Sequence, residues 1–278
     1  MRWFKASLLF LFVSPALAVE DYILGGGAES DSTDGLSGVV FTDVGLTDKT
    51  RVSASLGKSA VSLPNGIDLN TAYGDVGFEH WFDPVGIRME VAYWGDADIF
   101  DSLDGRGSFY WRNDKTTLAA NMEYRDFEFD IFRNDVLPGQ DVRFHAKGIG
   151  ASANFRLSDV VSLSLRGMDY NYNVDLRLDS NRRIIELLSI SRLSLINSLV
   201  DYRVSAGLGL DVGKRRWDFT YLTLRGEVDG STTHSATVHF LTSMGGRSDI
   251  QFGLGVDDSD VYGSVTFFSV FLYFYGGS

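Results

Sequence analysis

The sequence predicts an all-β fold, an antiparallel up-and-down β-barrel of about 14 strands that crosses a membrane, with about 12 strands as the alternative. Three observations predict it: a composition that favours strands, a two-residue hydrophobic repeat, and connections that alternate between short and long. No Pro-rich or Ser-rich linker divides the chain after its first residues. We therefore expect one domain, residues 19–278, preceded by a targeting segment, residues 1–18.

The composition favours strands over helices. The 278 residues include 30 Gly, 20 Phe, 12 Tyr and 5 Trp. Aromatic residues favour strands and Gly weakens helices. No stretch after residue 18 offers the run of about 20 uncharged apolar residues that a membrane-spanning helix needs. The chain has no Cys, which excludes disulfides, thiolate metal sites and thiol catalysts. Its net charge of −12 argues against nucleic acid as a partner.

The hydrophobic repeat has a period of two residues in segment after segment. In residues 50–56, 87–93, 202–212 and 250–256, apolar residues alternate with polar or small ones. Successive side chains of a strand face opposite sides of a sheet, so each segment presents one apolar face and one polar face. The pattern predicts strands that separate an apolar environment from a polar one.

The connections between these segments alternate in length. Bacterial transmembrane barrels have short turns at one end, longer loops at the other and an even number of strands. Short polar turns are expected at 46–50, 82–86, 112–116, 157–160, 212–216 and 244–249, and longer stretches at 58–70, 95–105, 126–142, 171–199 and 226–232, with the short 257–260 as the exception. The predicted strands begin near residues 21, 36, 50, 69, 86, 105, 116, 143, 160, 200, 216, 232, 249 and 261.

The charged residues of the strands favour a membrane barrel with a polar lumen. An Arg or Lys on the lipid face near the bilayer midplane costs about 2–4 kcal/mol, so charged side chains should face the lumen. In the alternative, a soluble β-sandwich, the same side chains would face solvent. The residues predicted to line the lumen are Arg51, Asp75, Glu79, Arg88, Glu90, Arg106, Glu123, Arg166, Arg203 and Asp211.

The aromatic residues also favour the membrane barrel, because they gather near both ends of the predicted strands. Two aromatic girdles at the membrane interfaces are typical of such barrels. One predicted girdle, beside the short turns, contains Trp81, Phe82, Trp111, Phe155, Trp217 and Phe219, and the other, near the long connections, contains Tyr93, Trp94, Tyr124, Tyr170 and Tyr202.

The first residues have the order of a cleavable signal peptide. Arg2 and Lys5 precede an apolar run over residues 6–13, and the small residues Ala16 and Ala18 follow it. The run is too short to cross a bilayer of about 30 Å as a helix. We expect export and cleavage after Ala18; a buried amino-terminal helix is the alternative.

The last segment, residues 261–275, is the most apolar of the mature chain and closes on Tyr273, Phe274 and Tyr275, with Gly-Gly-Ser after it. These closing aromatics resemble the terminal strand that the barrel-assembly machinery recognises in outer-membrane proteins of Gram-negative bacteria. The resemblance is to this class of protein as a whole. It implies an outer-membrane location, contact with outer-membrane lipid and lipopolysaccharide, and the barrel-assembly machinery and periplasmic chaperones as partners.

Residues 179–199 depart from the strand pattern. Apolar residues repeat there at helical spacing, namely Ile184, Leu187, Leu188 and Leu195, and Asp179 or Ser180 could cap the start of the helix. The alternative is a pair of long strands that extend beyond the membrane. In either case the segment belongs to the longest outer loop, where a helix could pack against the barrel or narrow its mouth.

No catalytic, cofactor-binding or metal site is expected. The 4 histidines, His80, His145, His234 and His239, lack the spacing of a helix-borne zinc site. His234 and Ser235 are adjacent, so on a strand their side chains point to opposite faces. They are weak support for the Ser and His chemistry that lipid-modifying outer-membrane enzymes use.

Two further patterns carry little chemistry. Asp96, Asp98, Asp101 and Asp104 supply the oxygen ligands that Ca²⁺ prefers, but their spacing does not fit a regular calcium loop. A solvated outer loop is the favoured interpretation. The glycine-rich stretches do not lead from a strand into a helix with a following Lys and Ser or Thr, which excludes a phosphate-binding loop.

Three functions remain open at this stage. The first is a passive channel for small polar solutes, in which the charges of the lumen set selectivity. The second is a closed structural or accessory barrel of an envelope complex, and the third is a lipid-modifying enzyme. The sequence names no solute.

Overall fold

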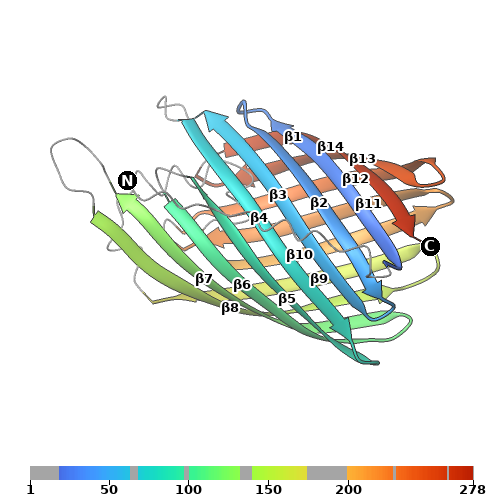
Figure 1. Ribbon diagram of the computed structural model, residues 1–278. Coiled ribbons are helices and arrows are strands. Elements are labelled where there is room, and N and C mark those ends of the chain that lie inside the picture. The colour runs from blue at the N-terminus through green and yellow to red at the C-terminus, as the bar shows by residue number, and fades with distance from the viewer. Residues whose placement is uncertain are drawn as a thin grey trace.

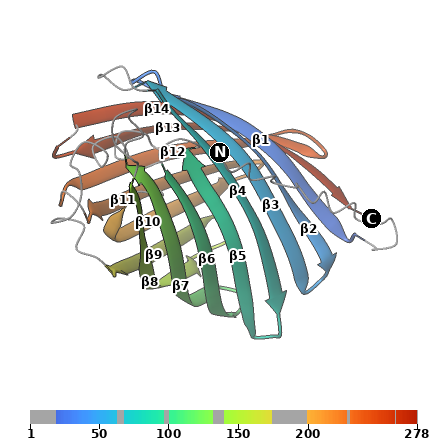
Figure 2. The same cartoon turned by 60° about the vertical axis from the view of Figure 1, so that its left-hand side comes forward.

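The computed structural model describes residues 19–62, 68–96, 100–131, 140–173, 199–227, 230–261 and 263–277. These residues form 14 strands, which join into one closed barrel (Figures 1 and 2). The strands are β1 (Asp21–Asp31), β2 (Leu36–Thr47), β3 (Thr50–Ser62), β4 (Asp68–Trp81), β5 (Val85–Asp96), β6 (Phe100–Arg112), β7 (Thr116–Ile131), β8 (Gln140–Arg156), β9 (Val161–Tyr172), β10 (Val200–Val212), β11 (Arg215–Gly226), β12 (Thr232–Gly245), β13 (Ser248–Ser259) and β14 (Gly263–Gly277).

The strands follow an up-and-down order. Each strand pairs antiparallel with its neighbours in the sequence, and β1 pairs with β14 to close the sheet. Asp21 at the start of β1 lies opposite Gly277 on β14 and Gly45 on β2. β1 therefore begins, and β14 ends, at the edge of the barrel where the short turns lie. The predicted antiparallel barrel and the larger of its two predicted strand numbers are confirmed.

Several strands extend further toward the long connections than the sequence predicted. β6 begins at Phe100 instead of residue 105, and β8 begins at Gln140 instead of residue 143. The expected long stretch at 95–105 contains the paired ends of two strands, with Asp96 opposite Phe100. The hydrogen bonds between paired strands join backbone groups and do not depend on the side chains. Two strands can therefore stay paired beyond the point where apolar and polar side chains stop alternating. Loop lengths predicted from the polar stretches of the sequence are therefore too long.

The two faces of the sheet differ in the sense that a membrane protein requires. Large apolar side chains point outward and are exposed, among them Val91 at 58% and Leu254 at 62%. A contiguous apolar surface of this kind would be unfavourable in water and marks contact with an apolar phase. A soluble sandwich would bury these side chains between two sheets. The single closed sheet with its apolar side outward is incompatible with that alternative.

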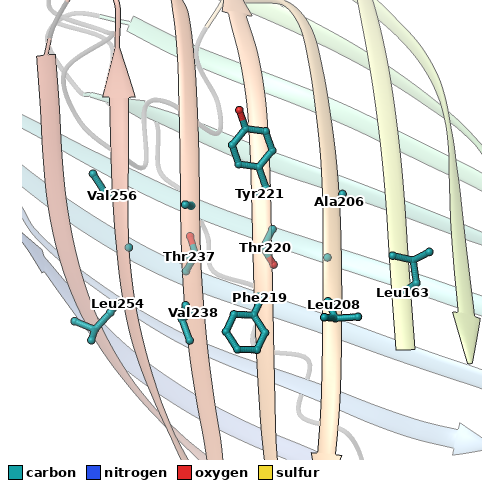
Figure 3. Close-up of a pocket in the computed structure, with 13 residues that line it drawn as sticks. Leu163, Ala206, Leu208, Phe219, Thr220, Tyr221, Thr237, Val238, Leu254 and Val256 are labelled. Carbon is teal, nitrogen blue, oxygen red and sulfur yellow. The ribbon is translucent and has the colours of Figure 1, made fainter. Parts of the chain in front are cut away.

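Figure 3 shows the alternation on one part of the wall, from β9 to β13. Phe219 and Tyr221 on β11 lie on the near, outer side of the sheet, and Thr220 points behind it, toward the interior. Ala206 and Ala236 are the register partners of Tyr221 on the neighbouring strands. Their small side chains leave an apolar depression on the outer surface. The chemistry of this depression suits lipid acyl chains, because its lining is almost wholly hydrocarbon.

The predicted aromatic girdles are correct only in part. Trp111 and Trp217 lie on the outer surface. Trp94 and Tyr170 are 3% and 4% exposed and belong to the interior. Trp81 shares the strand face of inward Glu79, and the guanidinium of Arg112 lies 4.7 Å from its ring centroid. The distance of these rings from the strand ends correctly predicted their height along the barrel. Whether a ring points inward or outward depends instead on whether its residue is odd or even along the strand.

Among the described residues, no helix is long and apolar enough to cross a bilayer. The predicted signal peptide, residues 1–18, lies outside the described residues, as does nearly all of the helix predicted over 179–199. Both remain predictions.

The sorting of side chains predicts unequal costs for the same charge at adjacent positions of β11. Phe219→Arg places a guanidinium on the lipid face and should lower the free energy of unfolding by about 2–4 kcal/mol. Thr220→Arg places it in the interior and should cost less than about 1 kcal/mol. Urea titration of the proteins folded in phosphatidylcholine vesicles measures both values, and equal losses would contradict the assignment of faces.

Candidate functional site: the charged interior of the barrel

The interior is the candidate site, because the charged side chains converge there. The strand register places every residue predicted to line the lumen on the face opposite the apolar exterior. Arg51 lies opposite Glu79, Glu79 opposite Arg88, Glu90 opposite Arg106, and Arg106 opposite Glu123. Asp75 lies opposite Ser55, Arg166 opposite Ser205, and Asp211 opposite Arg216. That these residues line a path for solutes stays a prediction.

Glu123 on β7 is the centre of the interior network. Its Oε1 accepts a hydrogen bond from Arg106 Nε at 3.1 Å. Its Oε2 accepts from Tyr170 Oη at 2.6 Å and from Arg203 Nη2 at 2.8 Å. Arg125 Nε lies 3.9 Å from Oε1. One carboxylate therefore joins cations and a phenol from β6, β7, β9 and β10.

A glycine makes the contact between β9 and β7 possible. Tyr170 on β9 reaches Glu123 on β7 by lying over Gly148 of the intervening β8, which is its register partner. A Cβ atom at position 148 would lie 2.6 Å from a ring carbon of Tyr170. A side chain there would displace the phenol from the carboxylate, so the network requires glycine at this point.

Asp104 and Arg125 complete the network and were missed by the sequence analysis. Both are 1% exposed, and Arg125 Nε lies 3.3 Å from an Asp104 carboxylate oxygen. Arg106 Nη2 also contacts Asp104 at 3.2 Å, and its Nη1 contacts Glu90 at 2.5 Å. The sequence did contain a sign of this position. Asp104 and Arg125 are each two residues from a predicted lumen residue on their own strand, and residues two apart on a strand share a face.

The acidic cluster expected in a solvated outer loop is dispersed in the structure. Asp104 belongs to the buried network, and Asp96 accepts a hydrogen bond from the backbone N–H of Asn70 at 2.8 Å. Asp101 lies on the outer face of β6, the face of Leu103, and Asp98 lies outside the described residues. The loop interpretation is wrong for Asp96 and Asp104, because β5 and β6 continue through them. Among the described residues, no group of His, Asp or Glu is arranged to hold a metal ion.

Smaller ion-pair groups lie at the short-turn end of the interior. Arg51 contacts Asp21 at 2.8 Å and Asp43 at 2.6 Å, and Arg88 contacts Glu79 at 2.5 Å. At the same end, on the part of the wall from β6 to β11, residues line a cavity of about 460 Å³. Its charged lining residues include Arg112, Arg156, Asp211, Arg216 and Asp218.

Arg166 on β9 differs from its neighbours. It makes no ion pair within the described part of the chain, and its side chain is exposed toward the interior space. The charged groups near it include Arg203 and Arg106 as well as Glu123. Among the described residues it is therefore an inward-facing cation without an ion-pair partner.

The ion pairs between described residues run along the wall of the barrel. Among these, the ion pair that spans the most strands joins Arg203 on β10 to Glu123 on β7, three places apart in the barrel. Strands on opposite sides of the barrel are seven places apart. Pairing of this kind holds charges against the wall instead of drawing opposite walls together. The interior of the described barrel is lined by the network without being bridged by it.

His234, the histidine adjacent to Ser235, lies outside the interior network. His234 lies on the outer face, where its Nδ1 is 2.8 Å from Tyr221 Oη and 3.1 Å from Thr223 Oγ1. Ser235 has the inward parity, opposite Leu222. The two side chains occupy opposite faces of β12, so they do not form a nucleophile and base pair.

No protein-family model matches the chain, and no curated protein sequence matches it. Solved structures match its fold. The CymD monoaromatic hydrocarbon channel superposes with a TM-score of 0.58 at 8% identity, covering 94% of this chain and 89% of that one. A loop-deletion mutant of OmpT, an outer-membrane protein of Vibrio cholerae, superposes with a TM-score of 0.52 at 8% identity, covering 93% and 99%. The chain thus has the fold of a Gram-negative outer-membrane β-barrel.

The network predicts a large stability loss when its central carboxylate is removed. Glu123→Ala leaves Arg106, Arg125 and Arg203 without a shared anion in a buried setting and should cost about 3–5 kcal/mol of unfolding free energy. Glu128→Ala removes a carboxylate that pairs with Arg143, whose side chain is 68% exposed, and should cost less than about 1 kcal/mol. Urea unfolding in vesicles compares the two, and a similar small loss for both would show that the network does not stabilise the wall.

Proposed function

We propose that this chain is a passive channel for small polar solutes in the outer membrane of a Gram-negative bacterium. The observation that carries the proposal is the direction of the interior ion pairs, which follow the wall and leave opposite walls unjoined among the described residues. The apolar exterior supports the membrane location, since it matches the hydrocarbon core of a bilayer. The polar interior supports the passage of hydrated solutes.

The charges of the wall support selectivity. The inner face of β6 to β10 carries Arg106, Arg125, Arg166 and Arg203. The inner positions of the described strands from β12 through β14 to β2 carry no Arg or Lys and several carboxylates, including Asp249. A solute in the lumen would cross a field directed from the basic wall to the acidic one, and such fields discriminate by charge.

The alternative of a closed structural barrel is less well supported. A barrel sealed by its own charges needs pairs that cross from one wall to the other, and the ion pairs between described residues are lateral. The alternative of a lipid-modifying enzyme lacks the pairing of His234 with Ser235 that it would need. We retain outer-membrane lipid, lipopolysaccharide, periplasmic chaperones and the barrel-assembly machinery as proposed partners.

The channel proposal predicts ion conductance and a defined role for Arg166. The protein inserted into a planar bilayer in KCl should give discrete conductance steps. Arg166→Glu replaces an available lumen cation by an anion, so the ratio of chloride to potassium permeability should fall by about twofold or more. The reversal potential under a KCl gradient measures this ratio.

Lys147→Glu is the matched control for the charge change. Its register partner Tyr124 belongs to the exposed outer set, so the side chain of Lys147 lies outside the lumen. This variant should leave the permeability ratio unchanged. Absence of conductance in the unaltered protein would end the channel proposal.

A further inference from the structure

A second interior cavity, of about 280 Å³, lies in the half of the barrel nearer the long connections. Trp94 on β5 lines it, and His239 on β12 lines it as well. β5 and β12 are seven places apart in the closed order, so they stand on opposite sides of the barrel. A solute in this cavity would therefore be within reach of both walls.

Aromatic rings form much of the surface of this cavity. Tyr73, Trp94 and Phe271 are among its lining residues. The ring of Phe271 covers the inner side of Gly27, since a Cβ atom at that glycine would meet the ring. A ring that lies against the backbone of the wall turns its other face toward the lumen. The cavity therefore offers flat apolar surface, which suits a ligand with an apolar face.

Two buried polar atoms at the cavity have no hydrogen-bond partner among the described residues. They are Nε1 of Trp94 and Oγ of Ser269, in side chains that are 3% and 1% exposed. Buried polar groups are almost always paired, so an unpaired donor beside a cavity points to a group that a ligand supplies. Ser59 and Thr71, which also line the cavity, bond to each other at 2.5 Å and are already satisfied.

The charges at the cavity argue against an anionic ligand. Glu29 lines it and has the inward parity. Lys58 also belongs to the lining, but its register partners Gly38 and Ala72 are on the outer face, so its ammonium points away from the lumen. A carboxylate accepts hydrogen bonds from hydroxyl groups and repels an anion.

We propose that this cavity is a binding subsite for a neutral saccharide, one pyranose ring at a time. A pyranose has an apolar C–H face that lies on an aromatic ring, and hydroxyl groups at its edge that can accept from Trp94 Nε1, exchange hydrogen bonds with Ser269 and donate to Glu29. The volume is near the lower end of the range for small-molecule sites, about 300–1,000 Å³. The proposal rests on the channel function and names a class of solute for it.

Calorimetric titration of the detergent-folded protein tests the subsite without requiring conductance. Maltose is the neutral saccharide probe and glucuronate is the anionic one. Phenol is an aromatic probe that has one hydroxyl group instead of the several that a pyranose carries. Maltose should bind, and glucuronate and phenol should bind at least about tenfold more weakly. Trp94→Phe keeps the ring and removes the donor, and Ser269→Ala removes the hydroxyl. Each should weaken maltose binding by about 3- to 10-fold, the value of one hydrogen bond.

Matched controls separate the subsite from a general effect on the fold. Trp81→Phe removes a Trp Nε1 that is also buried and unpaired, but at the short-turn end of the interior. Ser205→Ala removes an inward hydroxyl from β10 on another part of the wall. Neither control should change the affinity for maltose by more than about twofold.

The outcomes distinguish the subsite from the channel. Absence of maltose binding, tighter binding of glucuronate or phenol, or equal losses in Trp94→Phe and Trp81→Phe overturns the subsite, and KCl conductance then still supports the channel. Maltose binding together with block of the ionic current by maltose supports both proposals. Maltose binding without any conductance supports the subsite and overturns the channel.

Discussion

Closure of the sheet between β1 and β14 is the constraint on which the rest of the structure depends. In hydrocarbon an unpaired backbone N–H or C=O costs several kcal/mol, and an open edge would expose a whole strand of such groups. The register from Asp21 opposite Gly277 to Asp31 opposite Phe267 pairs both edges. Once the barrel is closed, successive side chains of each strand face either the lipid or the interior.

The interior network follows from this sorting. A charged side chain on the lipid face is costly near the bilayer midplane, so the charged side chains of the network lie on the inner face, and there the curvature of the wall brings residues of non-adjacent strands together. Glu123 meets Arg203 and Tyr170 in this way, with Gly148 leaving the space between them. The same sorting leaves Arg166 and the aromatic cavity beside Trp94 facing the interior, where the proposed channel would bring a solute to them.

Much of this architecture could be predicted from the sequence, and the part that could not has a physical reason. Period-two alternation locates strands and assigns faces, so the positions of Arg106 and Glu123 on the inner face followed from it. Alternation says nothing about polar stretches that are paired through their backbones, and β6 was therefore predicted to begin too late. Trp94 and Tyr170 were assigned to the membrane interface by their distance from the strand ends, although parity places them inside. Contacts across an intervening strand, such as Tyr170 over Gly148, depend on curvature and shear, which no local pattern encodes.

The central claim is that one face of every strand meets lipid and the other meets water. The chain has no Cys, so a single introduced Cys on β11 provides one unique thiol. In lipid vesicles, a polar maleimide that does not cross membranes should react with Cys at positions Asp218, Thr220 and Leu222 and spare Cys at Trp217, Phe219 and Tyr221. Reaction at consecutive positions, or no reaction at the inward ones, would contradict the account.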